Sequence, residues 1–255
     1  NNHVGALFYN ITEHVQKSLN YYDTPNGVFV GYIQIGSPSN LAGLKFGDII
    51  TKVDENVFPS SAELANYIYN KAAGVEIVLT VWRHSIRDHI TIPIKGVPAE
   101  VLINMVKPDA ELFYIYQEIG KVGEGFSMLE SLVAEGDPAA MLELSFQTSL
   151  QGKDKSSDER IHRLSRRAYD IVTEELIEYD NSVKALSREA YIQRQVIFNL
   201  AFNYRWGIGT PQDLVKAERL YNQAKDIGSS HAYQQLAVIE FGRGKPKKAI
   251  LLLEE

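Results

Sequence analysis

Few residues of this chain have the types and spacing that chemistry requires. Cysteine is absent, which excludes disulfides, cysteine nucleophiles and zinc–thiolate sites. His84 and His89 lie at or just after a polar turn without a third ligand, so they do not form a zinc pattern. No Gly-x-Ser-x-Gly or Gly-Asn-Ser-Gly-Gly nucleophile segment occurs. We therefore predict no catalytic residue, no metal site, no cofactor and no enzymatic activity within this chain.

Length and composition indicate a globular protein of about two domains, with 255 residues of which 45% are hydrophobic. The net charge is −6 and neither half is basic: residues 1–96 carry 7 basic and 8 acidic side chains, and residues 97–255 carry 19 and 24. A nucleic-acid partner is therefore not expected. No run reaches the roughly 18 apolar residues of a membrane span. Because the chain begins at Asn1 and stops at Glu255 inside a helical pattern, we interpret it as a fragment whose targeting signal or anchor could lie elsewhere.

The first part of the chain has the pattern of short strands joined by turns. The sequence predicts four strands, at 27–35, 48–53, 76–83 and 86–94. Their residues are β-branched and aromatic or alternate with apolar positions, and polar turns separate them. Thr12 is a candidate cap for a helix over 13–19, and Ser60 or Ser61 for a helix over 62–72. Two helices among short strands predict an α+β domain.

The second part has helical periodicity and no strand signal. Lys95-Gly96-Val97-Pro98 is the predicted boundary, because a proline often occupies the first turn of a helix. Self-comparison aligns residues 125–144 with 217–236 without a gap, and Leu200-Ala201 with Leu236-Ala237. We predict two domains, 1–96 and 97–255, of which the second is all-helical.

The segment Gly36–Ile50 carries the most specific signal of the chain. It joins two predicted strands through a turn, a short helix and two glycines, Gly43 and Gly47, which suit a helix end and a turn. This segment resembles the most recognisable part of PDZ domains in the form found in HtrA-type proteases. The resemblance covers about residues 3–94 and implies a partly open β-barrel or sandwich with two helices. Its own apolar residues are expected in the core, and Asp48 is expected to brace the turn.

The resemblance also implies a peptide-binding groove. PDZ domains of this type hold a short loop with a central glycine before their peptide-binding strand, and His3-Val4-Gly5-Ala6-Leu7-Phe8 stands in that position. Backbone N–H groups of such a loop bind a carboxylate, and the peptide then adds as a strand. His3 has two alternatives, contact with that carboxylate or exposure to solvent. The predicted peptide-binding residues are Val4, Gly5, Ala6, Leu7, Phe8, Leu64, Ala65 and Ile68.

Two features of this predicted groove stay open. Leu64 and Ile68 could face the core instead of the peptide. Ala6 replaces the bulkier aliphatic residue usual in the family, which predicts a deep or widened pocket for a large apolar C-terminal residue. An inert PDZ fold with a closed or unused groove is the alternative to a working site.

The helical part resembles SEL-like repeats, relatives of the tetratricopeptide repeat that stack antiparallel helix pairs into a solenoid. The match is nearly complete for one repeat and covers about residues 108–255 with degenerate neighbours; the matching residues are Leu200 to Gly209, Asp213, Lys216, Ala217, Tyr221, Ala224 and Gly228. Stacked repeats depend on their neighbours for burial. The resemblance implies an all-α solenoid of antiparallel helix pairs.

Together these observations predict a protein–protein interaction module. Its groove would bind protein C-termini or extended peptides, and its helical repeats would bind a possible second protein. Two alternatives stay open: the regulatory, substrate-targeting portion of a longer HtrA-like serine protease whose catalytic domain lies upstream, and a structural scaffold. The resemblance implies a periplasmic or otherwise exported location, whereas the absence of cysteine is equally compatible with the cytoplasm.

Overall fold

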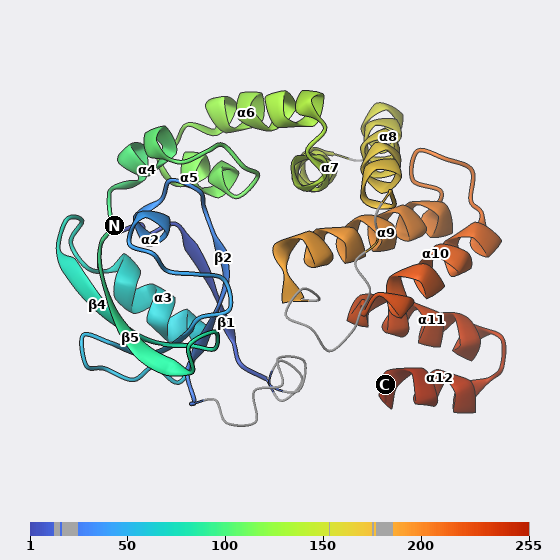
Figure 1. The fold of residues 1–255 in the computed structure, drawn as a ribbon. Helices are drawn as coiled ribbons and strands as arrows, with labels where there is room; N and C mark the ends of the chain where they lie inside the picture. Colours follow the sequence, from blue (N-terminus) through green and yellow to red (C-terminus); the bar gives the residue numbers. More distant parts are fainter. Residues whose placement is uncertain (13–15, 17–24, 153, 175, 177–185, 255) are drawn as a thin grey trace. The chain divides into compact units, whose positions relative to one another are not determined.

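A computed structural model describes residues 1–12, 16, 25–152, 154–174, 176 and 186–254 (Figure 1). Among these residues the chain forms two compact units. The first holds residues 1–128 and 186–188, and the second holds residues 129–176 and 189–254. Helix α6 (Val122–Glu135) belongs to both units.

The first unit is built on an antiparallel sheet of five strands, joined side by side in sequence order. The strands are β1 (Ala6–Asn10), β2 (Val28–Ile33), β3 (Ile49–Val53), β4 (Glu76–Arg83) and β5 (Asp88–Lys95). β1 pairs with β2 and stands at the edge of the sheet. An edge strand presents unpaired backbone groups along its outer side, which can bind a further strand. The predicted α+β layout, with a sheet followed by helices, is confirmed.

The strands follow from alternation of apolar residues. In β4 the side chains of Ile77, Leu79 and Val81 are buried and face the core, while their neighbours are less buried. The observed span of β4 equals the predicted one. The strand predicted at 27–35 is correct in type but ends two residues too late, because Ile35 and Gly36 already turn towards a short helix.

In the part of the chain that the structure describes, two short helices interrupt the strands, α2 (Pro38–Leu41) and α3 (Ser61–Tyr69). The predicted cap of α3 is Ser60, whose Oγ accepts the Glu63 N–H at 3.2 Å. Gly43 has φ +83° after α2, the left-handed conformation predicted from the sequence. The helix predicted over 13–19 lies outside the described residues, apart from Thr12 and Gln16; the Gln16 N–H donates to the Thr12 carbonyl at 2.9 Å.

The core of the first unit lies between the sheet and α3. Its buried residues come from all five strands or the segments beside them, and α3 contributes two: Val4, Val28, Val30, Leu44, Ile50, Val53, Leu64, Ile68, Ile77, Leu79, Val81, Ile92 and Ile94. Val4 belongs to this cluster, so the loop before β1 is fixed to the core by an apolar side chain.

Asp48 braces the turn before β3, as predicted, and also carries a buried ion pair. Its side chain is 2% exposed and accepts hydrogen bonds from Arg83 at 2.6 and 2.8 Å and from the Lys45 N–H at 2.9 Å. Arg83 also donates to the Gly43 carbonyl at 2.8 Å. The hydrogen bonds to Asp48, more than any other influence, raise the pKa of Arg83. This pair joins the start of β3 to the end of β4.

After β5 the described chain is helical. The helices are α4 (Ala99–Met105), α5 (Leu112–Glu118), α6, α7 (Pro138–Gln151), α8 (Lys155–Val172), α9 (Arg188–Trp206), α10 (Leu214–Asp226), α11 (Ser230–Gly242) and α12 (Pro246–Glu254). The change from strand to helix falls beside the predicted boundary at 96–97. The compact unit nevertheless continues through α4 and α5 to Met128, so the division of domains at residue 96 stays a prediction. No helix of the described chain is both long and apolar enough to span a membrane.

The second unit is held together by apolar helix contacts and by an ionic cluster. Ala140, Ala201 and Ala232 are completely buried, and such small side chains let helices approach closely. One buried cluster joins α9, α10 and α11 through Leu200, Tyr221 and their neighbours.

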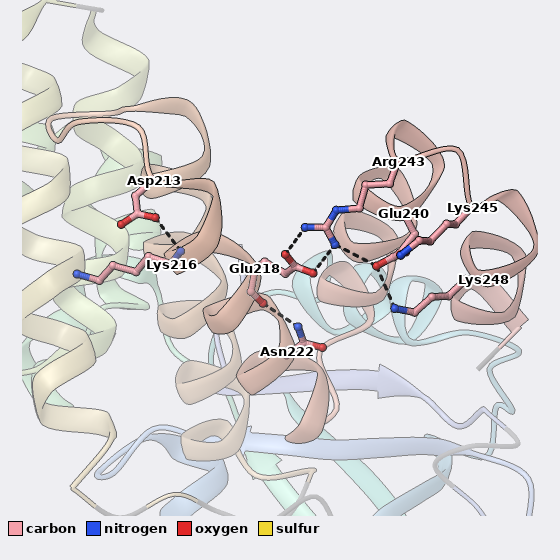
Figure 2. Close-up of polar contacts among 8 residues, drawn as sticks. All are labelled: Asp213, Lys216, Glu218, Asn222, Glu240, Arg243, Lys245 and Lys248. Carbon is pink, nitrogen blue, oxygen red and sulfur yellow. Dashed lines mark hydrogen bonds and ion pairs between the residues drawn. The ribbon is translucent and has the colours of Figure 1, made fainter.

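The ionic cluster of the second unit links α10, α11 and α12 (Figure 2). Glu240 of α11 is 3% exposed and accepts hydrogen bonds from Arg243 at 3.2 Å and from Lys248 of α12 at 3.0 Å. Arg243 also binds Glu218 of α10 at 2.6 and 2.7 Å, and Lys245 lies 3.9 Å from Glu240. A buried carboxylate is tolerated when cations surround it in this way.

The buried pair predicts a specific loss of stability. Replacing Asp48 with alanine leaves Arg83 without its partner, and breaking a buried pair costs about 3–5 kcal/mol. The measurement is urea unfolding followed by Trp82 fluorescence in a Trp206→Phe background, because the two tryptophans lie in different units. Lys52→Ala is the control, since its pair with Glu55 is exposed and should be worth less than about 1 kcal/mol. Equal losses for the two variants would contradict this account of Asp48.

Candidate functional site

A groove of about 430 Å³ lies in the first unit beside β1 and α3. Its lining comes from the loop before β1, from β1 and β2, from α3, and from α4 and α5. The lining residues are Asn2, His3, Val4, Gly5, Ala6, Leu7, Phe8, Tyr32, Gln34, Ala65, Ile68, Tyr69, Leu102, Glu111, Tyr114 and Ile115. Its volume falls within the range of about 300–1,000 Å³ typical of ligand pockets.

The structure brings most of the predicted site residues together. Val4, Gly5, Ala6, Leu7 and Phe8 form one wall, and Ala65 and Ile68 belong to the wall made by α3. Leu64 and Ile68 are both buried in the core cluster, at 1% and 3% exposure, but Ile68 also lines the groove and Leu64 does not. Consecutive residues of a helix point in different directions, so Leu64 faces the core where Ala65 faces the groove. The core alternative for Leu64 is therefore the observed one. The role of the lining residues in binding stays a prediction.

The backbone of the loop is suited to an anion. Gly5 has φ +68°, and its carbonyl accepts the Gln34 N–H at 2.9 Å. The Val4 carbonyl accepts the Ser39 N–H at 3.0 Å. Both carbonyls are therefore bound within the fold, while among the described residues the N–H groups of Val4 and Gly5 have no backbone acceptor. Such N–H groups can hold a carboxylate.

Ser37 lies directly beneath the loop. A Cβ placed on Gly5 would come within 2.3 Å of the Ser37 Cβ and 2.8 Å of its Oγ. The Ser37 Oγ donates to the Gly5 carbonyl at 3.2 Å, and it accepts the Asn40 N–H at 3.3 Å as the N-cap of α2. The segment 36–50, which was expected to contribute to the core and to brace a turn, thus also contacts the loop through Ser37.

One end of α5 is fixed to β2. Asp109 precedes the helix and is 8% exposed; it accepts hydrogen bonds from Gln34 at 3.1 Å and from the Tyr32 hydroxyl. Burial first, and then the hydrogen bond to Asp109, raise the pKa of Tyr32, so its hydroxyl remains a donor. Arg188 adds a second support, because its guanidinium lies 4.6 Å from the centre of the Tyr32 ring and 3.4 Å from Glu111.

The other end of α5 is fixed beside the loop. The Oε1 atom of Glu118 lies 3.2 Å from His3 Nε2 and accepts hydrogen bonds from the Asn1 amide at 2.8 Å and the Tyr69 hydroxyl at 3.2 Å. Burial alone would raise the pKa of Glu118, but these hydrogen bonds and the charge of His3 lower it. The side chain of His3 is only 10% exposed, so the solvent-exposed alternative for His3 was wrong.

The residues of α4 and α5 were not predicted as part of the site. Leu102, Glu111, Tyr114 and Ile115 line the groove although they follow the sheet in sequence. The sequence holds one signal, because the proline in Lys107-Pro108-Asp109 ends one helix before the next begins. In the structure α5 has only seven residues, fewer than the helices of a repeat. That signal indicates a separate short helix but not the surface on which it packs.

The groove offers hydrogen-bond donors and apolar walls rather than a reactive constellation. In the described part of the chain no group of three or more histidine or acidic side chains is placed to hold a metal ion. His3 is the histidine that lines the groove, and it faces the Glu118 carboxylate; the lining residues include neither serine nor cysteine. The arrangement is suited to binding.

Comparison with known proteins identifies the class of this domain. The PDZ domain family profile matches residues 10–94, which span the sheet from the end of β1 to β5. The first part of the chain therefore contains a PDZ domain, a non-catalytic module. Its similarity is to the HtrA type: it is 30% identical over 95 residues to a probable periplasmic serine endoprotease DegP-like of Brucella suis biovar 1, covering 37% of this chain and 18% of the relative.

Other similar proteins are matched over different shares of their length. Human syntenin-1 is 37% identical over 57 residues, covering 22% of this chain and 19% of syntenin-1. The chain thus spans about a fifth of the length of the curated relatives it matches. Among solved structures, the HtrA3 PDZ domain bound to a phage-derived ligand (FGRWV) is 24% identical, covering 38% of this chain and 85% of that one with a TM-score of 0.32. The HtrA-type protease AlgW with decapeptide is 18% identical, covering 42% and 30%, with a TM-score of 0.35.

The contact between Gly5 and Ser37 predicts strong coupling between two positions. Gly5→Ala adds left-handed strain of about 1–2 kcal/mol and a clash of about 1–3 kcal/mol. Ser37→Gly alone removes the side-chain cap of α2. It should lower the free energy of unfolding by only a few tenths of a kcal/mol, because glycine is tolerated at the N-cap position. In the double variant the clash disappears, so its loss should be at least about 1 kcal/mol smaller than the sum of the two single losses.

The same urea unfolding, followed by Trp82 fluorescence, measures this cycle. Additive losses would contradict a direct contact between the two side-chain positions. Because a bulky residue at position 5 damages the fold, substitution of Gly5 is not a clean test of binding.

Proposed function

We propose that the groove binds the C-terminal segment of a partner protein. The peptide adds as a strand along the outer edge of β1, and its terminal carboxylate accepts hydrogen bonds from the N–H groups of Val4 and Gly5. The side chains of Ala6, Phe8, Ala65 and Ile68 contact the peptide and select among sequences. The observation that carries the proposal is the pair of N–H groups without a backbone acceptor among the described residues, on residues that line a groove beside an edge strand.

The PDZ similarity supports the same proposal. PDZ domains bind peptides by strand addition, where main-chain hydrogen bonds give affinity and side-chain pockets give specificity. The HtrA3 PDZ domain was solved with a phage-derived ligand bound, which is a property of that protein. For this chain the groove geometry adds support that does not depend on the similarity.

We assign the helical part to SEL-like repeats that hold a second protein. The support is local: Gly207 and Gly209 of the matching motif have φ of +68° and +61°. A Cβ on Gly209 would lie 2.1 Å from the Asp158 carbonyl oxygen of α8, so the motif glycine permits close packing of two segments. Replacing the exposed Val238 and Phe241 of α11 with aspartate tests whether this helix binds the second protein: the variant should lose a protein that the wild-type chain captures while its groove is saturated with peptide.

The DegP-like similarity favours a second candidate, in which this chain regulates or targets a serine protease and acts outside the cytoplasm. The observation that decides this candidate is the coding sequence upstream of Asn1. A trypsin-like domain with a serine–histidine–aspartate triad there would support it, and its absence would contradict it.

Carboxylate recognition predicts a dependence on the free chain end. Fluorescein-labelled peptides with a free acid should bind about 10–100 times more tightly than the same peptides with a C-terminal amide, because hydrogen bonds to a charged group are worth about 1.5–3 kcal/mol. Fluorescence anisotropy measures both dissociation constants. Equal affinity of acid and amide would contradict the proposed role of Val4 and Gly5.

A matched pair of α3 variants locates the binding site. Ala65 and Ala62 are both exposed on α3, but only Ala65 lines the groove. Ala65→Trp should fill the groove and weaken peptide binding at least about tenfold, since it removes the space that the peptide needs. Ala62→Trp should leave the dissociation constant unchanged. Both variants should keep the wild-type circular dichroism spectrum, since neither alanine is buried. Binding that survives Ala65→Trp would place the peptide elsewhere.

A further inference from the structure

Helix α5 contributes to the groove lining and is anchored beside the Val4–Gly5 loop. Its start is fixed through Asp109 to Gln34 at 3.1 Å, and its end through Glu118 to His3 at 3.2 Å. Gln34 and His3 flank the Val4–Gly5 loop, since the Gln34 N–H binds the Gly5 carbonyl and His3 precedes Val4 in the chain. The two ends of α5 are therefore attached to residues on either side of this loop.

The helix is a fixed part of the first unit. Leu112 and Phe113 are 1% and 0% exposed. The Phe113 ring makes an edge contact with Phe126 of α6, with 5.0 Å between centroids. Leu102 of α4, also buried, belongs to the same apolar cluster as Leu112. Burial of this extent is typical of a wall rather than of a loosely attached flap.

Between its two anchors α5 presents side chains to the groove. Tyr114 and Ile115 line the groove together with Ala6, Ala65 and Ile68. Because Ala6 and Ala65 are small, the space above the loop is bounded by α5 rather than by β1 and α3. Glu111 also lines the groove, where it is paired with Arg188 at 3.4 Å.

From this geometry we infer that α5 is the end wall of the peptide groove. It restricts the groove to chain ends, because a peptide continuing past the loop would meet α5. It also sizes the pocket for the terminal side chain, with Tyr114 and Ile115 as specificity-determining residues that select a large apolar residue. This inference rests on the proposed peptide binding and assigns ligand contacts to a helix outside the matched residues 10–94.

Two sets of probes test the inference with the full chain. The first set is fluorescein-labelled octapeptide pools with random upstream positions and free acids, ending in Leu, Phe, Ala or Asp. The second set carries the same sequences followed by Gly-Ser-Gly-Ser. Wild-type protein should prefer the Leu and Phe pools over the Ala and Asp pools, and should bind the extended pools at least about tenfold more weakly, the effect of a lost charged hydrogen bond.

Variants of α5 separate the wall from the rest of the groove. Tyr114→Ala and Ile115→Ala should weaken binding of the Leu and Phe pools about five- to twentyfold and leave the Ala pool within about twofold, because only large side chains reach the wall. Glu118→Ala removes one anchor of the helix and should improve binding of the extended pools. Gln117→Ala is the matched control, because Gln117 is exposed on the same helix and does not line the groove.

The outcomes distinguish the inference from the proposed function. If free-acid pools bind but Glu118→Ala does not improve binding of the extended pools, or if the Tyr114 and Ile115 variants affect all pools alike, the end wall is wrong and the PDZ groove stands. If no free-acid pool binds the wild-type chain, the proposed function fails and the inference fails with it.

Discussion

The site depends on one close contact, the seating of the Val4–Gly5 loop on the turn that begins α2. The turn binds both carbonyls of the loop, through the Ser39 and Gln34 N–H groups, and leaves no room for a side chain at position 5. The carbonyls of the loop are engaged, whereas the N–H groups of Val4 and Gly5 have no backbone acceptor among the described residues. The other end of α2 is held to the sheet by Arg83, which donates to the Gly43 carbonyl and pairs with Asp48.

Around this contact the fold arranges three surfaces with different physical roles. The edge strand β1 supplies unpaired backbone groups, which bind without regard to sequence. Helix α3 buries Leu64 and Ile68 and exposes Ala65 to the groove, so one helix contributes to both core and site. Helix α5 adds apolar side chains and is held by polar anchors at its two ends, so the site is more enclosed than the sheet and α3 alone would make it.

Local signals in the sequence were sufficient for the fold and insufficient for the whole site. Alternation in residues 76–83, the cap at Ser60 and the glycine at position 43 each act within a few residues, and the structure confirms them. The loop at Gly5 was found because its position before a strand resembles a family pattern. Its dependence on Ser37 was missed, since that contact joins residues 32 positions apart. The same reason explains why the role of α5 was missed. No local pattern in residues 109–118 indicates that Asp109 binds β2 and that Glu118 binds His3.

The most direct test of the central claim is an NMR titration of the ¹⁵N-labelled chain with one free-acid peptide and its C-terminal amide. If the loop binds a carboxylate under the α5 wall, the free acid shifts the amide resonances of Val4, Gly5, β1, Tyr114 and Ile115. The amide form then leaves Val4 and Gly5 nearly unchanged. Shifts that spare Val4 and Gly5 with both peptides, or that fall on the helices of the second unit, would contradict the account.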